Sequence, residues 1–195
     1  RLAAEQGDLH AQASLGSMYE AGSHLPKDSA EAEKWYCLAV DQGHAGAVVR
    51  LFQMYYYGSG EQKDFAKAMK WARVAADQGL AFGSYHLGLM YHTGGQGQPQ
   101  DLAEAVKWYR KAAEQGHASA QYRLGVMYDG GGVVLQDYVA AYAWINIAEA
   151  NGYKSAPKFK SLLEKEMTPD QITKGETLSK EMIKKNPKLI TKQQN

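Results

Sequence analysis

A repeat of 36 or 37 residues runs through most of this sequence and constrains its fold more than any other feature. The recurring elements are a Trp, a Gly, a Met-Tyr pair and an Asp placed seven residues before the Trp. The Trp column is Trp35, Trp71, Trp108 and Trp144, and the Gly column is Gly7, Gly43, Gly79, Gly116 and Gly152. A period of this length is typical of proteins in which each unit buries its apolar face against its neighbours.

The first half of each unit has the apolar spacing of one helix face. In the first copy, Ala11, Leu15, Met18 and Tyr19 follow the order i, i+4, i+7 and i+8. A Gly follows the Leu in three copies, at Gly16, Gly88 and Gly125, whereas Phe52 stands there in the second copy. Because Gly weakens a helix, these positions predict a close approach of the partner helix, with a different packing in the second copy.

The second half of each unit predicts another helix, which begins at the recurring Asp and ends at the recurring Gly. The Asp column is Asp28, Asp64, Asp101 and Asp137. A carboxylate there can accept bonds from the free amides of the first turn, and Glu31 and Glu104 are placed to complete capping boxes. The Gly suits the left-handed position after a helix end. The Trp and Met columns are expected to pack in the core.

The motifs of these units resemble a known repeat family. They are Leu-Gly-x-Met-Tyr, Asp-x-x-x-Ala and Lys-Trp-Tyr-x-x-Ala-Ala-x-Gln-Gly, of which residues 107–116 are the clearest copy. Over residues 1–152 the chain resembles the Sel1-like repeat, a relative of the tetratricopeptide repeat. The resemblance implies an all-α, right-handed superhelix of antiparallel helix pairs with C-terminal capping helices.

The domain organisation follows from the same register. Four repeats are expected at residues 8–43, 44–79, 80–116 and 117–152. Residues 1–7 match residues 110–116, so we expect them to end a truncated preceding repeat of a longer protein. Residues 153–195 are expected to form a helical cap and tail, with a fresh helix start at Thr168. The stretch from Pro187 lacks an apolar pattern and is expected to be dispensable.

Composition and motif searches exclude several function classes. A net charge of +1 argues against a nucleic-acid partner, and no apolar run approaches the roughly 20 residues of a membrane span. The single cysteine, Cys37, allows no internal disulfide, and the six His show no recognised metal-ligand spacing. We therefore expect no enzyme activity, no metal and no cofactor, and a monomeric chain.

The expected function follows from the resemblance, because the first helices of such arrays line a concave groove that binds a protein or peptide. Residues at groove positions that differ between copies are the candidate contacts: Tyr56, Phe82, Tyr85, Leu89, His92, Tyr122, Val126 and Asp129. Aromatic residues are common anchors of such contacts. Two alternatives stay open: these side chains pack inside the fold, or the groove takes a cell-wall glycan or small molecule, as in β-lactam binding.

Overall fold

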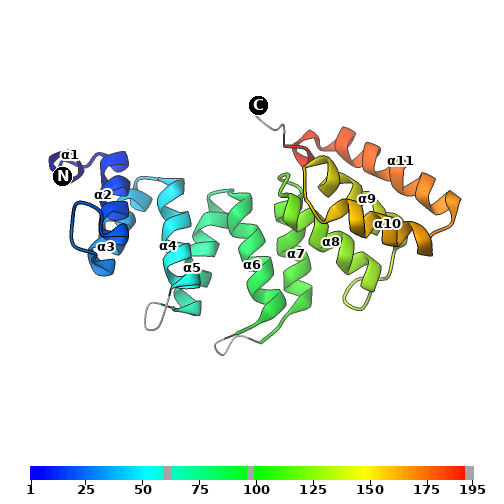
Figure 1. Ribbon diagram of the computed structural model, residues 1–195, viewed down its shortest axis with the longest axis horizontal. Helices are drawn as coiled ribbons and strands as arrows, with labels where there is room; N and C mark the ends of the chain where they lie inside the picture. The colour runs from blue at the N-terminus through cyan, green and yellow to red at the C-terminus, as the bar shows by residue number, and fades with distance from the viewer. Residues whose placement is uncertain (59–62, 96–98, 192–195) are drawn as a thin grey trace. The chain divides into compact units, whose positions relative to one another are not determined.

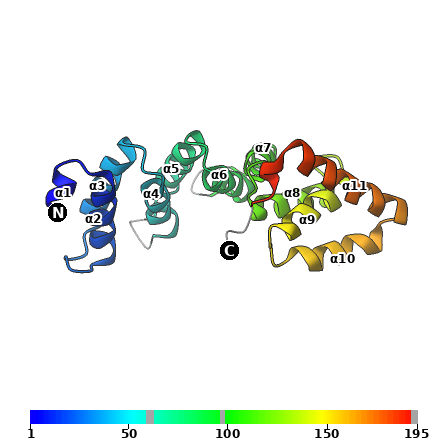
Figure 2. The ribbon, with the colours of Figure 1, turned by 90° about the horizontal axis from the view of Figure 1, so that it is seen from above.

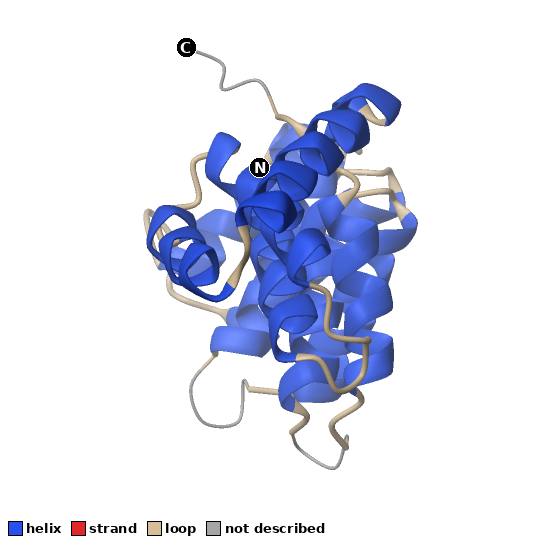
Figure 3. Cartoon of the chain, turned by 90° about the vertical axis from the view of Figure 1, so that its right-hand side faces the viewer, coloured by secondary structure: helices blue, strands red, loops and turns tan. Residues whose placement is uncertain are grey.

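The computed structural model describes residues 1–58, 63–95 and 99–191, and helices form nearly all of its regular structure (Figures 1 and 3). The chain divides into two compact units, Arg1–Gly83 and Ser84–Asn195, and each is described by itself. Within the described residues, no helix combines the length and the apolar character needed to cross a membrane.

The first unit consists of helix pairs. Helix α2 packs on α3, α3 on α4, and α4 on α5. The elements are α1 (Leu2–Glu5), α2 (Leu9–Ala21), α3 (Ser29–Asp41), α4 (Ala45–Tyr57), α5 (Phe65–Asp77) and the first residues of α6 (Ala81–Thr93). Each pair therefore corresponds to the two halves of one sequence unit.

The second unit contains further helix pairs, which are followed by two capping helices. Its elements are the rest of α6, α7 (Leu102–Ala113), α8 (Ala118–Gly130), α9 (Tyr138–Ala150), α10 (Ala156–Glu166), α11 (Pro169–Lys185) and η2 (Pro187–Leu189). Both α10 and α11 pack on α9, which lies between them in Figure 2. The expected capping helices are therefore present.

The recurring Asp caps the second helix of every pair, as the sequence predicts. Asp64 Oδ1 accepts a bond from the amide of Lys67 at 2.9 Å, and the other three Asp make equivalent bonds. The expected capping boxes at Asp28 and Asp101 are wrong. The amide of Asp28 donates instead to the carbonyl of Tyr19, and that of Asp101 to the carbonyl of Tyr91. The same bond recurs at the two other Asp, so it ties the second helix to the end of the first.

The glycines of the first helices lie against large side chains, which confirms the predicted close approach. A Cβ on Gly16 would lie 2.8 Å from the ring of Tyr36, and one on Gly88 would lie 2.5 Å from the ring of Tyr109. In the second helix pair, the large and the small side chain have exchanged helices. Phe52 replaces the glycine, Ala72 stands where the other copies have Tyr or Ile, and both are fully buried.

The Trp and Met columns differ in burial. Trp35, Trp71 and Trp144 are at least nine-tenths buried, in agreement with the sequence, and Trp108 is partly buried. The expectation of a uniform Met core is wrong, because Met90 is fully buried but Met18 is 40% exposed. Of the four methionines in this column, Met90 alone is fully buried, while Met54 and Met127 are half-buried.

The C-terminal residues contradict the prediction that they are dispensable. Leu189 is 2% exposed and belongs to the same buried cluster as Ala113 and Ile147. Its carbonyl accepts bonds from the side-chain amides of Gln121 at 2.8 Å and Asn151 at 2.7 Å. The segment up to Thr191 is thus an integral part of the second unit, while residues 192–195 lie outside the described chain.

Candidate binding surfaces

In the first unit, the two candidate residues Tyr56 and Phe82 share one aromatic neighbour. The ring of Tyr56 stacks on Phe52 with 5.0 Å between centroids, and Phe82 meets Phe52 edge to face at 5.3 Å. Tyr57, which is 65% exposed, lies edge to face against Tyr56 at 4.8 Å. Sequence analysis did not select Tyr57, although it extends the Tyr55-Tyr56-Tyr57 run that marks this surface.

In the second unit, Tyr85 is half-buried and stacks on His117, with 4.4 Å between the ring centroids. His117 in turn begins α8, because its Nδ1 accepts a bond from the amide of Ala120. Sequence analysis did not select His117 or its counterpart His44 as helix caps. Both are N-caps, and His44 Nδ1 accepts from the amide of Ala47 at 3.0 Å.

Two imidazoles contact the ring of Tyr85: His86, which is buried, and His117, which is half-buried. Burial lowers the pKa of His117, and burial together with His117 lowers the pKa of His86 to about 4. His86 is 7% exposed and its ring lies edge to face against Tyr85 at 5.1 Å. These imidazoles are therefore neutral at pH 7, and they support the stacked Tyr85 ring without adding charge to this surface.

Two further candidates lie on α6. His92 is half-buried, and its ring centroid lies 6.1 Å from that of Tyr109. Burial lowers the pKa of His92, and the positive charge of Arg123 lowers it further. Leu89 packs against the buried cluster of the second unit. Leu89 is half-buried, so, like Tyr85, it combines packing with partial exposure.

The remaining candidates lie along α8. Tyr122 is half-buried and packs on Tyr153 at 4.5 Å and on Phe159 at 5.6 Å. Val126 and Asp129 follow on the same helix and are also half-buried. Burial, and secondarily the charge of Glu166, raises the pKa of Asp129. This face of α8 thus offers one aromatic ring, one apolar side chain and one carboxylate.

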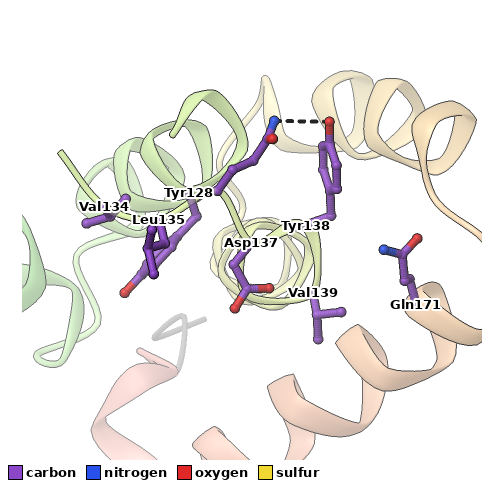
Figure 4. A pocket seen from close by; sticks show the side chains of 8 residues that line it. Tyr128, Val134, Leu135, Asp137, Tyr138, Val139 and Gln171 are labelled. Carbon is purple, nitrogen blue, oxygen red and sulfur yellow. Dashed lines mark hydrogen bonds between the residues drawn. The ribbon is translucent and has the colours of Figure 1, made fainter. Parts of the chain in front are cut away.

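A hollow of about 560 Å³ lies beside the loop that joins α8 to α9 (Figure 4). Its walls include Tyr128, Leu135 and Tyr138, and Gln171 faces it from the first turn of α11. Leu135 is 91% exposed, and Gln136 Nε2 donates to the Tyr138 hydroxyl at 3.0 Å. Sequence analysis missed this hollow, although three consecutive apolar residues, 133–135, stand in a loop there.

The described residues offer little for catalysis. Among residues 1–58, 63–95 and 99–191, no group of three His, Cys, Asp or Glu side chains could hold a metal ion. A Ser-x-x-Lys spacing, which β-lactam-binding enzymes use, occurs at Ser155 and Lys158 and was overlooked in the sequence. Both side chains are exposed at the start of α10, unlike a nucleophile held against its base.

The fold and these surfaces define a helical-repeat protein of the solenoid class. The pattern of the Sel1 repeat family matches residues 9–44, 45–80, 81–117 and 118–153. The chain therefore belongs to the Sel1 repeat family. Members of this family are generally non-catalytic scaffolds for protein interactions.

Solved structures agree with this assignment. A Sel1 repeat protein from Oxalobacter formigenes is 37% identical with a TM-score of 0.68, over 83% of this chain and 46% of that one. The protein c5321, a protective antigen of uropathogenic Escherichia coli with an SLR fold, is 30% identical with a TM-score of 0.62, over 95% and 48%. The chain thus spans about half the length of each. No curated protein matches the chain.

Proposed function

We propose that this chain is a non-enzymatic scaffold that binds an extended protein or peptide segment through its first-helix faces. The observation that carries the proposal is the set of half-buried aromatic rings held in place by stacked neighbours. Tyr85 on His117 and Tyr122 on Tyr153 are the two clearest cases. Such rings are pre-organised and still accessible, which suits an anchor of a protein contact.

Each unit supplies its own anchors to this function. In the first unit these are Tyr56 and Phe82, and in the second unit they are Tyr85, His92 and Tyr122. Val126 and Asp129 add an apolar contact and an acceptor beside Tyr122. Leu89 adds a half-buried apolar side chain on α6.

The test is selection of peptide ligands from a random library against the chain, followed by titration of the best ligand. Tyr85→Ala combined with Tyr122→Ala is expected to weaken binding by about 30-fold, the scale of a hot-spot loss of about 2 kcal/mol. Phe82→Ala combined with Tyr56→Ala tests the first unit in the same way. Leu2→Ala, at a 69% exposed leucine of α1 outside the candidate surfaces, is the control.

The outcomes separate the alternatives. Unchanged far-ultraviolet circular dichroism with weakened binding supports the proposal. A sharp loss of helicity shows that the rings are core residues. If the library yields no peptide and cell-wall glycan fragments or a β-lactam raise the melting temperature instead, the ligand of this surface is a small molecule or glycan and not a protein.

A further inference from the structure

The C-terminal segment of this chain is held on the second unit as a short peptide that makes one 3-10 turn, Pro187–Leu189, and then extends through Ile190. The carbonyl of Leu189 accepts bonds from Gln121 and Asn151, and the amide of Thr191 donates to Asn151 Oδ1 at 2.9 Å. Asn186 Nδ2 donates to the carbonyl of Glu114 at 2.8 Å. The recognition therefore uses the backbone of the segment together with one buried leucine.

The amides that hold this segment form a small network of their own. Asn151 Nδ2 donates to Gln121 Oε1 at 2.8 Å, and Gln121 Nε2 donates to the carbonyl of Ala113 at 3.1 Å. Ile147, fully buried, belongs to the same apolar cluster as Leu189. The carbonyl of Lys188 passes so close to Gly116 that a Cβ there would lie 2.6 Å from it.

The first unit contains the same network in the register that aligns Trp35 with Trp144. Gln42 Nε2 donates to Gln12 Oε1 at 2.8 Å, and Gln12 Nε2 donates to the carbonyl of Ala4 at 3.2 Å. These residues correspond in order to Asn151, Gln121 and Ala113. Both the donors and their geometry are thus reproduced. The two middle repeats lack the pair, since Val48 and Ser84 stand where Gln12 and Gln121 stand.

In the first unit this surface is open. Leu38, the counterpart of Ile147, is 39% exposed, and no described atom lies within 4 Å of a Cβ built on Gly7, the counterpart of Gly116. Gly43 and Gly79, which have complete repeats before them, are equally open. A preceding repeat therefore leaves the glycine position open, whereas in the second unit Lys188 and Thr191 of the tail fill it.

We propose that Gln12, Gln42 and Leu38 form a second peptide site, which binds a segment of a partner protein that is similar to Pro-Lys-Leu-Ile-Thr and makes the same turn. In this site a partner leucine packs beside Leu38, as Leu189 shares a buried cluster with Ile147, and its carbonyl accepts from the side-chain amides of Gln12 and Gln42. The site lies outside the aromatic first-helix surface of the proposed function, so either site can fail without the other.

The test is titration of a labelled peptide of residues 186–191, with blocked ends, into the 195-residue chain, followed by fluorescence polarisation. Side-chain amide signals in ¹H–¹⁵N spectra locate the site. We expect the signals of Gln12 and Gln42 to shift while those of Gln121 and Asn151 stay. Gln42→Ala and Leu38→Asp alter exposed or half-exposed residues and are each expected to weaken binding about fivefold or more.

Matched controls fix the interpretation. Gln78→Ala removes the equivalent amide of the second repeat, where Val48 replaces the buried Gln, and is expected to leave binding unchanged. The peptide with Asp in place of its Leu is expected not to bind. Absence of binding, equal binding by the reversed peptide, or no effect of Gln42→Ala overturns the site.

The occupant is tested separately by light scattering at the concentrations used for the titration. A monomeric chain is expected if the occupant is a partner protein. A dimer that Gln42→Ala abolishes would show that the site takes the tail of a second copy of this chain, and would overturn the assignment of a partner.

Discussion

At the scale of single residues, glycine sets how closely the helices of a pair approach each other. Gly88 has no side chain, and the ring of the fully buried Tyr109 occupies the space beside it. Gly16 and Tyr36 repeat this arrangement in the first unit. The glycine is therefore kept for space rather than for backbone freedom, although it costs the helix about 1 kcal/mol relative to alanine.

Gly88→Ala is accordingly expected to lower the free energy of unfolding by about 1–3 kcal/mol, because the rigid ring of Tyr109 cannot yield to the added methyl group. Gly130→Ala is the control, since nothing lies within 4 Å of a Cβ at that position. Urea unfolding followed by circular dichroism measures both. A Gly88→Ala variant as stable as the parent would show that the helix pair relaxes freely.

The buried imidazole of His86 makes stability depend on pH. Its pKa in the folded chain is about 4, below the ordinary value of 6.5, so the folded state binds fewer protons than the unfolded one. Stability is then present above pH 6.5 and is lost as the pH falls towards 4. A decrease of about 2 kcal/mol between pH 7 and pH 5 is expected from this group.

Urea midpoints at pH 7 and pH 5 measure this effect. His86→Phe is expected to reduce the difference between them. Equal pH dependence in the parent and in His86→Phe would mean that other groups, such as His117, are responsible.

At the scale of elements, one aspartate in the connecting loop binds to both helices of each pair. The recurring Asp caps the second helix with its side chain, and its amide donates to the tyrosine carbonyl of the first helix. Apolar side chains such as Leu124 fill the space between the helices and are fully buried. One helix pair cannot bury its outer faces alone, so a loss of stability in one pair should spread to the neighbouring pairs.

Leu124→Ala is expected to cost about 2–5 kcal/mol, the range for deletion of a buried leucine side chain. Hydrogen exchange should show faster opening in α7 and α9 as well as in α8. Leu135→Ala, at a 91% exposed leucine, is the matched control. An unchanged unfolding midpoint for Leu124→Ala would contradict its place in the core.

Sequence reasoning predicted these elements well where a residue type acts in its usual way. Aspartate is a preferred N-cap, so the starts of the second helices followed directly from the repeat. Histidine is not a preferred N-cap, and the caps at His44 and His117 were not predicted. The hollow beside α8 was missed because its apolar loop residues form no periodic pattern. The partial burial of Tyr122 depends on neighbours such as Phe159, which lies beyond the matching repeat.

At the scale of the whole chain, the last repeat is capped in part by a segment whose sequence does not indicate this role. Residues 184–191 are rich in lysine, and an isolated Leu-Ile pair carries no helical spacing. The structure nevertheless buries Leu189 and binds its carbonyl with two amides. Closure at this end thus combines helix packing by α10 and α11 with backbone recognition of a short peptide.

Leu189→Ala is therefore expected to lower the free energy of unfolding by about 2–5 kcal/mol, as for other buried leucines. A chain ending at Asn186 should lose at least as much. Lys188→Ala removes an exposed side chain of the same segment and is expected to have little effect. Equal urea midpoints for Leu189→Ala and the parent would restore the view that the segment is dispensable.

The exchange of sizes at Phe52 and Ala72 limits how such a chain can be recombined. A hybrid that joins α4 to a second helix carrying Tyr36 would set two large rings against each other. The reciprocal hybrid, with Gly16 facing Ala72, would leave a void. Intact hairpins can therefore be duplicated, deleted or shuffled between genes or designs, whereas single helices cannot, and the break points that natural or engineered variation tolerates should fall in the turns after Gly43 and Gly79.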